Sequence, residues 1–260
     1  MPQKQPTGSY RAYSSKAAAN NLSKGVSLPA VFPLQGIFAS TKEVIQRNPA
    51  EIVKSTKETL SHGRGNVWTD IKENNGASYK RTLGGMAIAS DRGYRRDSRT
   101  AFNGAPVNLQ QRLKDVLPFI IMGAGNCMEH AVVAMFQTNF KYPGKHIWLM
   151  SWAEGDHQFL LISDVNDIER ATVVDAWDPS KNNKPYRDCE WYHPKNVAES
   201  PGHIVADGVD YITAALANIN NKDELVESGI AEGNKRSRGI DFSSYGNFKG
   251  SSPEFKTYNF

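Results

Sequence analysis

One stretch of the chain, residues 117–178, constrains the fold more than any other. Its first part repeats apolar side chains at helical spacing directly after the glycine-rich turn 123–125. Three apolar runs separated by polar turns follow, at 146–152, 157–162 and 171–177. Such runs are typical of an antiparallel β-meander. The sequence therefore predicts an α+β fold in which one helix packs on a meander.

The composition fits one sizeable domain with irregular flanks. The chain has 260 residues, of which 39% are hydrophobic and 22% charged, as in globular proteins. Its best apolar run, 117–124, is far shorter than the ~18 residues that a membrane-spanning helix needs, so no membrane span is expected. Two cysteines, Cys127 and Cys189, exclude a disulfide framework and a Cys₄ zinc site.

Changes in composition divide the chain into three parts. We expect a flexible basic leader at 1–40, a single catalytic domain at 41–232, and a Gly/Ser/Lys-rich tail at 233–260. Outside the central stretch, helical spacing predicts helices at 41–60 with a break at Pro49, at 109–116 with a stop before Pro118, at 211–219 and at 223–230. Residues 61–108 show no readable periodicity.

The formal charge of +4 belongs to the leader and not to the body. Residues 1–42 hold five basic and no acidic side chains, which leaves 26 basic and 27 acidic in the rest. The arginines at 92–99 alternate with aspartates, as on a solvated face, so we do not expect nucleic acid as a partner. The leader also lacks the apolar stretch of a Sec signal. We expect secretion or injection by another route, with residues 1–40 contacting a secretion apparatus or chaperone.

Cys127 is the candidate nucleophile. It falls in the first turn of the predicted helix, where unpaired backbone N–H groups and the helix dipole favour the reactive thiolate. The glycines before it allow a substrate carbonyl to approach, and the Cys127 N–H is a natural oxyanion donor. A buried structural cysteine is the alternative reading of Cys127 taken alone.

His157 and Asp175 are the candidate base and orienting carboxylate. If the turns close symmetrically, His157 lies opposite Trp152 on one neighbouring strand and opposite Ala176 on the other, one residue from Asp175. That counting has an error of one residue, but it places both side chains at the same end of adjacent strands. Asp178, the other carboxylate nearby, follows the strand, so Asp175 is preferred.

Together, Cys127, His157 and Asp175 supply a nucleophile, a general base and a carboxylate that orients the base, in this order along the chain. This is the composition of a thiol catalytic triad. Four neighbours are candidates for the oxyanion site or the pocket: Asn126, Gln158, Trp152 and Trp177. Core or rim packing is the competing role for the two tryptophans. Gln158 should point to the opposite face of its strand from His157.

A zinc site is the competing constellation. Cys127 and His130 share a helix face and could bind zinc together with His157, leaving an open fourth position. A metalloprotease helix would need a second histidine one turn after His130, where the chain has Ala134. We expect no cofactor.

The sequence around these residues resembles the papain-like superfamily, and within it the transglutaminase-core and bacterial effector members. The motifs are GNCMEHA at 125–131, GDHQF at 155–159 and VVDAW at 173–177. The resemblance implies a papain-like fold in which a Cys opens a helix, a His opens a strand and an Asp ends the next strand. It covers about 55 residues, and the interval from Cys127 to His157 is far below the ~130–150 residues of papain and cathepsins.

The expected function is hydrolysis of amide bonds in a protein substrate through a thioester on Cys127. Cysteine protease and glutamine deamidase both fit, and the superfamily also cross-links glutamine. The string VIQR at 44–47 resembles strings in bacterial polymorphic and contractile-injection toxins. With the basic leader it indicates a secreted effector or toxin acting in a target-cell cytoplasm. The alternatives are a zinc-dependent hydrolase or nuclease-type toxin that uses the arginines, and a non-catalytic binding module.

Overall fold

The computed structural model describes residues 49–91, 107–152, 157–193 and 202–242. All of them belong to one unit of the chain, Ile45–Phe260. Several features expected from sequence lie outside the described residues: the leader at 1–40, the string at 44–47, the arginines at 92–99, the turn at 153–156 and the tail from 243 onward. In the part that is described, no helix is long and apolar enough to cross a membrane.

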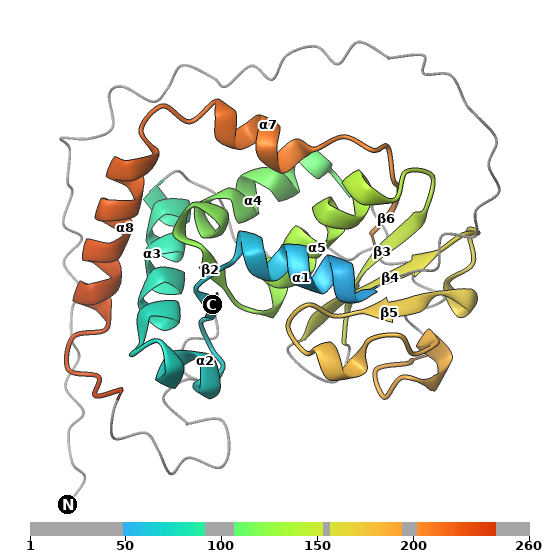
Figure 1. Ribbon diagram of the computed structural model, residues 1–260, viewed down its shortest axis with the longest axis horizontal. Coiled ribbons are helices and arrows are strands. Elements are labelled where there is room, and N and C mark those ends of the chain that lie inside the picture. Colours follow the sequence, from blue (N-terminus) through green and yellow to red (C-terminus); the bar gives the residue numbers. More distant parts are fainter. Residues whose placement is uncertain (1–48, 92–106, 153–156, 194–201, 243–260) are drawn as a thin grey trace, which may run out of the picture. The chain divides into compact units, whose positions relative to one another are not determined.

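The described chain contains both helices and strands (Figure 1). The helices are α1 (Pro49–Thr59), α2 (Trp68–Glu73), α3 (Ala77–Asp91), α4 (Leu109–Met122), α5 (Cys127–Lys141), α7 (Tyr211–Ala217) and α8 (Lys222–Arg236). The strands are β1 (Gly63–Arg64), β2 (Ala124–Gly125), β3 (His146–Ser151), β4 (Gln158–Ser163), β5 (Thr172–Val174) and β6 (His203–Val205). Short 3₁₀ turns are η3 (Ile168–Arg170), η4 (Pro179–Lys181) and η5 (Tyr186–Asp188). This mixture of helix and sheet is an α+β fold.

Four strands form an antiparallel sheet in the order β5-β4-β3-β6. Side chains alternate between its two faces along each strand. Leu160 and Ile162 of β4 belong to the larger core cluster, whereas Phe159 and Leu161 belong to a second one. The sheet is therefore buried on both faces, which explains why its strands are almost continuously apolar.

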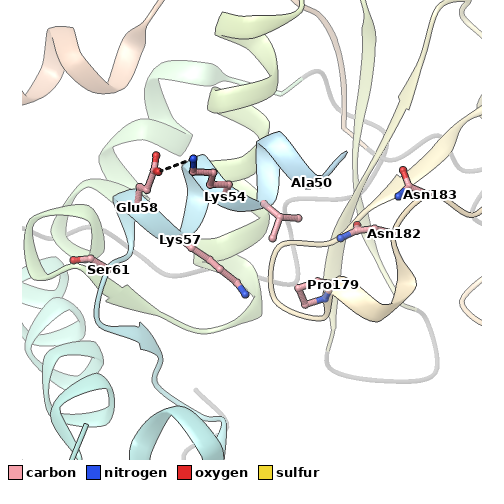
Figure 2. Close-up of a pocket in the computed structure, with 9 residues that line it drawn as sticks. Ala50, Lys54, Lys57, Glu58, Ser61, Pro179, Asn182 and Asn183 are labelled. Carbon is pink, nitrogen blue, oxygen red and sulfur yellow. Dashed lines mark ion pairs between the residues drawn. The ribbon is translucent and has the colours of Figure 1, made fainter. Parts of the chain in front are cut away.

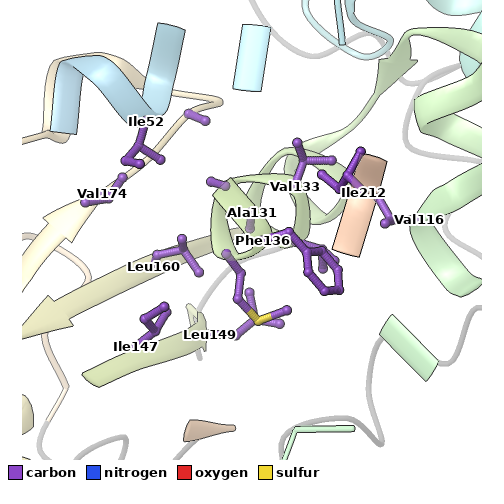
Figure 3. Packing of buried hydrophobic residues seen from close by; sticks show 14 of the residues in the cluster. Ile52, Val116, Ala131, Val133, Phe136, Ile147, Leu149, Leu160, Val174 and Ile212 are labelled. Carbon is purple, nitrogen blue, oxygen red and sulfur yellow. The ribbon is translucent and has the colours of Figure 1, made fainter. Parts of the chain in front are cut away.

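Helix α5 covers the face of the sheet that Leu160 occupies. Figure 3 shows apolar side chains of α5 meeting those of β3, β4 and β5, with contributions from α1, α4 and α7. The residues seen there include Ala131, Val133, Phe136, Ile147, Leu149, Leu160, Val174, Ile52, Val116 and Ile212. Because almost every side chain of α5 is buried, the helix is central to the core instead of lying on the surface.

The opposite face of the sheet is covered by the irregular segment after β5. Tyr186 and Trp191 pack there against Phe159, with ring centroids 6.2 and 4.7 Å from it. Cys189 is buried in the same cluster. Residues 180–207, which the sequence predicts to be loop-like with Trp191 and Tyr192 as anchors, thus include 3₁₀ turns, but also the strand β6.

A third packing centre joins α3 to α8. A Cβ at Gly233 would lie 2.0 Å from the carbonyl oxygen of Lys80, and one at Gly84 would lie 2.3 Å from that of Gly229. Only glycine allows such close approach of two helix backbones. Beyond α8, Phe242 packs on Tyr79 of α3 with ring centroids 5.7 Å apart. The packed part of the chain therefore continues past residue 232, where the sequence places the start of the tail.

The predicted register is confirmed for one strand pair and wrong by one residue for the other. Ile147 pairs with Ile162, as symmetric closure predicts. Leu160 pairs with Val174, where symmetric closure would pair it with Val173. The 3₁₀ turn η3 lies in the connection between β4 and β5, and it accounts for the shift of one residue. The shift has a consequence for the site, because a one-residue slip moves a side chain to the other face.

Two predicted helix ends are wrong. Helix α4 does not stop before Pro118 but continues to Met122, where Gly123 ends it in the left-handed conformation with φ 68°. Its last turn is buried, so packing offsets the hydrogen bond that proline cannot donate. Helix α8 continues six residues past 230, to Arg236, because its glycines are the points of contact with α3.

Candidate active site

Cys127 is the first residue of α5, as the sequence predicts, and the residue is 7% exposed. The turn before it is fixed by Glu129, whose Oε2 accepts a 2.7 Å hydrogen bond from the Asn126 N–H. A Cβ at Gly125 would lie 2.5 Å from the Cβ of Glu129, so this position requires glycine. The cysteine is thereby held at the positive end of the helix dipole.

The topology places Cys127 at the same end of the sheet as His157 and Asp175. Helix α5 ends at Lys141 and a tight turn leads directly into β3, so the helix runs antiparallel to β3 while packing on it (Figure 1). A 15-residue helix and a six-residue strand are both about 20 Å long. The start of α5 therefore lies near the end of β3, where β4 begins and β5 ends.

His157 and Asp175 are in direct contact. His157 Nε2 lies 2.6 Å from Asp175 Oδ2, and both residues are buried. The one-residue shift in register explains the contact, since it places Asp175 on the same face as His157 and Phe159. Asp178, the alternative carboxylate, caps the turn η4 and bonds Ser180 instead.

The Asp175 carboxylate is held rigidly by its surroundings. Its Oδ1 accepts hydrogen bonds from the backbone N–H groups of Trp177 and Asp178, at 2.8 and 2.9 Å. The side chain of Asn182 brackets the Asp175 backbone, accepting from its N–H and donating to its carbonyl oxygen at 2.5 and 3.1 Å. Oδ2 is therefore presented to His157 in a fixed direction.

Aromatic rings enclose the imidazole of His157. The rings of Trp191 and Trp177 lie 4.6 and 5.1 Å from it, centroid to centroid, and Phe159 lies 6.1 Å away. This enclosure shelters the hydrogen bond to Asp175 from water, which strengthens it. Trp177 was predicted to line the pocket, whereas the contribution of Trp191 was missed.

Arg64 joins the nucleophile segment to the carboxylate segment. Its backbone pairs with Gly125 in the parallel β1–β2 ladder, two residues before Cys127. Its Nη1 donates a 2.7 Å hydrogen bond to the carbonyl oxygen of Trp177, and its Nε and Nη2 bind both oxygens of Asp70 at 2.9 and 2.6 Å. The hydrogen bonds to Asp70, together with the charges of Asp178 and Asp175, raise the pKa of Arg64. A permanent positive charge therefore lies between the two halves of the candidate site.

The remaining predicted residues have separate roles. Asn126 is the residue directly before α5, and its backbone N–H donates to Glu129; its side-chain Oδ1 is buried without a hydrogen-bond partner among the described residues. Gln158 is 8% exposed and points away from His157, as the strand period predicts; its Oε1 is buried without a hydrogen-bond partner among the described residues. The backbone N–H of Trp152 donates to the His157 carbonyl oxygen at 2.9 Å. The Trp152 side chain packs on the second hydrophobic cluster, the one that contains Phe159.

The geometry gives no support to the zinc alternative. His130 is buried, and its Nδ1 lies 2.9 Å from the carbonyl oxygen of Asn126. Burial lowers the pKa of His130 to about 4. Within the described ranges, no group of three or more His, Cys, Asp or Glu side chains is placed to hold a metal ion.

A separate hollow of about 640 Å³ lies between α1 and the turn after β5 (Figure 2). Lys54 and Lys57 line it on the helix side, and Asn182 and Asn183 line it on the other. Cys127, His157 and Asp175 are not among its lining residues. Since Asn182 also brackets the Asp175 backbone, the hollow adjoins the back of the candidate site and not its reacting atoms.

Sequence reasoning missed Arg64 and Asp70, which lie in the stretch without readable periodicity. The one signal in the sequence was the pair of glycines at 63 and 65, on either side of Arg64. In the structure a Cβ at Gly65 would collide with the side chain of Thr82. Comparison of the chain with protein-family models, curated proteins and solved structures returned no match.

Proposed function

We propose that this protein is a cysteine-dependent hydrolase of amide bonds in proteins, with Cys127 as nucleophile, His157 as base and Asp175 as orienter. The observation that carries the proposal is the 2.6 Å hydrogen bond between His157 Nε2 and Asp175 Oδ2, at the end of the sheet where α5 begins with Cys127. A buried carboxylate that fixes an imidazole, together with a first-turn cysteine at the same end of the sheet, supplies the three groups that thiol catalysis needs.

The hydrogen bond to Asp175 assigns a task to each nitrogen of His157. With Nε2–H donated to the carboxylate, Nδ1 carries the lone pair that accepts the thiol proton. The Cys127 sulfur then bonds to the substrate carbonyl carbon, and the C–N bond breaks as His157 returns the proton to the leaving nitrogen. Water, deprotonated by His157, attacks the thioester; the C–S bond breaks and the thiol recovers its proton.

The order of elements supports placing this fold in the papain-like superfamily. The cysteine opens a buried helix, the histidine directly precedes a strand, and the aspartate directly follows the next strand. The helix packs on one face of the antiparallel sheet, and the other two residues lie directly beyond the ends of β4 and β5, with His157 packed against Phe159 and Trp191 of the second cluster. We propose a transglutaminase-core arrangement for residues 109–193, with α3 and α8 as an added layer.

Replacement of Cys127 tests the proposal, and the second cysteine provides a matched control. Candidate target proteins incubated with the wild-type protein should show new termini if it is a protease, or the mass shift of Gln-to-Glu conversion if it is a deamidase. Cys127→Ala should abolish either product. Cys189→Ala should retain it, because Cys189 is buried beside Trp191 and burial raises the pKa of its thiol.

Iodoacetamide gives a readout that needs no substrate. Peptide mapping should locate the label on Cys127 at neutral pH, with Cys189 labelled far more slowly. Equal slow labelling of both cysteines, with no product from any target, would favour a non-catalytic binding module. Product formation that survives Cys127→Ala would refute the proposal.

A further inference from the structure

The segment after β1 runs alongside the turn that leads to Cys127. Arg64 pairs with Gly125 in a parallel ladder, and the Gly65 N–H donates to the Gly125 carbonyl oxygen at 3.0 Å. The ladder ends with this pair of residues. Asn66 lies two residues after Arg64, and Cys127, the first residue of α5, lies two residues after Gly125.

The amide of Asn66 has a defined orientation. Trp177 Nε1 donates a 3.1 Å hydrogen bond to Asn66 Oδ1. An indole N–H can only donate, so the atom facing it must be the amide oxygen. The Asn66 Nδ2 group therefore points away from Trp177. It makes no hydrogen bond to any described residue, and the Asn66 side chain is exposed.

The group that orients Asn66 is itself fixed to the candidate triad. The Trp177 ring lies 5.1 Å from the ring of His157, and the backbone N–H of Trp177 donates to Asp175 Oδ1 at 2.8 Å. Its carbonyl oxygen is held by Arg64 at 2.7 Å. Asn66 is thus anchored both to the segment beside Cys127 and to the wall of the His157 pocket.

We infer that Asn66 is a catalytic residue whose Nδ2 donates a hydrogen bond to the oxyanion formed on Cys127; the inference rests on the proposed function. When the sulfur attacks, the carbonyl electrons move onto oxygen, and a donor fixed in advance stabilises that charge. Asn126, which the sequence suggests for this role, has a buried amide oxygen, whereas the Asn66 side chain is exposed. Asn66 is held in place by Trp177 and keeps both N–H groups of its amide for a ligand.

Two reactions of Cys127 distinguish a catalytic role of Asn66 from a structural one. Acylation by p-nitrophenyl acetate passes through an oxyanion and releases nitrophenolate, whereas alkylation by iodoacetamide is a direct displacement without one. Asn66→Ala should slow acylation by about 10²–10³-fold, mainly in kcat. The same change should leave the rate of alkylation within about twofold, since neither the thiol nor His157 is altered. Asn66→Asp should be at least as damaging to acylation, because a carboxylate repels the oxyanion.

Two further variants complete the design. Trp177→Phe removes the N–H that orients Asn66 while keeping a ring against His157, and it should cause a smaller loss of acylation. Asn221→Ala, at a position whose side chain caps no helix, should leave both rates unchanged.

Each outcome has a distinct meaning. Acylation that is unaffected in Asn66→Ala, or that falls in parallel with alkylation, would overturn the role of Asn66 and leave the proposed function intact. Nitrophenolate release by Cys127→Ala at the wild-type rate would overturn the proposed function and the role of Asn66 with it.

Discussion

Arg64 Nη1 donates a 2.7 Å hydrogen bond to the backbone carbonyl of Trp177, a residue 113 positions further along the chain. The guanidinium is held from its other side by both carboxylate oxygens of Asp70. This planar fork fixes the distance between the turn before Cys127 and the segment after Asp175. The geometry of the candidate site therefore depends on a residue outside the proposed triad.

We predict that Arg64→Lys lowers kcat by up to about 100-fold with little change in KM, because lysine keeps the charge but cannot bind Asp70 and Trp177 together. Asp70→Asn should lower kcat less, and the double variant should be no worse than Arg64→Lys alone. Steady-state kinetics with p-nitrophenyl acetate measure kcat and KM of each variant. Arg81→Lys is the matched control, since Arg81 also binds a backbone carbonyl, that of Met122, at 2.9 Å. A wild-type rate in Arg64→Lys would contradict the prediction.

The Asp175→Asn variant should fold normally and lose about 10³–10⁴-fold in kcat. The amide oxygen can still accept from the N–H groups of Trp177 and Asp178, which turns its NH₂ group toward His157. His157 must then accept at Nε2 and carry its proton on Nδ1, so it cannot take the thiol proton. Iodoacetamide labelling of Cys127 at neutral pH should slow in parallel. Asp178→Asn should retain wild-type activity and labelling; equal losses in the two variants would argue against the assigned orienter.

Gly233→Ala should destabilise the protein by about 1–3 kcal/mol, because the added methyl group would collide with the Lys80 carbonyl and force α8 away from α3. Activity per folded molecule should be unchanged, since the candidate site lies on other elements. Urea unfolding measures the loss. Ser228→Ala, on the exposed side of α8, is the control and should be neutral or slightly stabilising. Equal stability of the two variants would refute the close packing of these helices.

The buried His130 should make the fold sensitive to acid. Burial lowers its pKa to about 4 in the folded state, against about 6.5 in the unfolded chain. As the pH falls, the unfolded state therefore binds a proton first. The stabilising contribution is complete above about pH 6.5 and is lost progressively toward pH 4, by about 3 kcal/mol.

A His130→Asn variant isolates this effect, because its amide can still donate to the Asn126 carbonyl while the titrating ring is gone. The free energy of unfolding in urea should fall less steeply with pH in the variant than in the wild type. His62 and His203 remain in both proteins, and burial lowers the pKa of each, so some slope will persist. Identical slopes would show that His130 does not titrate in this range.

Local patterns in the sequence predicted the parts of the fold in which neighbours along the chain also pack together. The glycine turn and the apolar spacing after it placed Cys127 at the start of a helix, and the short polar turn gave the register of β3 on β4. The register of β5 came out one residue off, since symmetric counting cannot allow for a 3₁₀ turn. Helix α3 was missed and helix α8 was predicted too short, because glycines usually interrupt helices. Here the glycines are the points at which the two helices touch.

The sequence by itself determined the residue types and the chain order of the proposed thiol site, and it placed Cys127, His157 and Asp175 at the ends of predicted elements. Only the tertiary structure decided which side chains meet at that end of the sheet. Arg64 and Asn66 reach Trp177 across more than a hundred residues, through hydrogen bonds that leave no periodic trace in the sequence. Periodicity reports which face of an element is buried, whereas contacts between distant segments depend on how the whole chain packs.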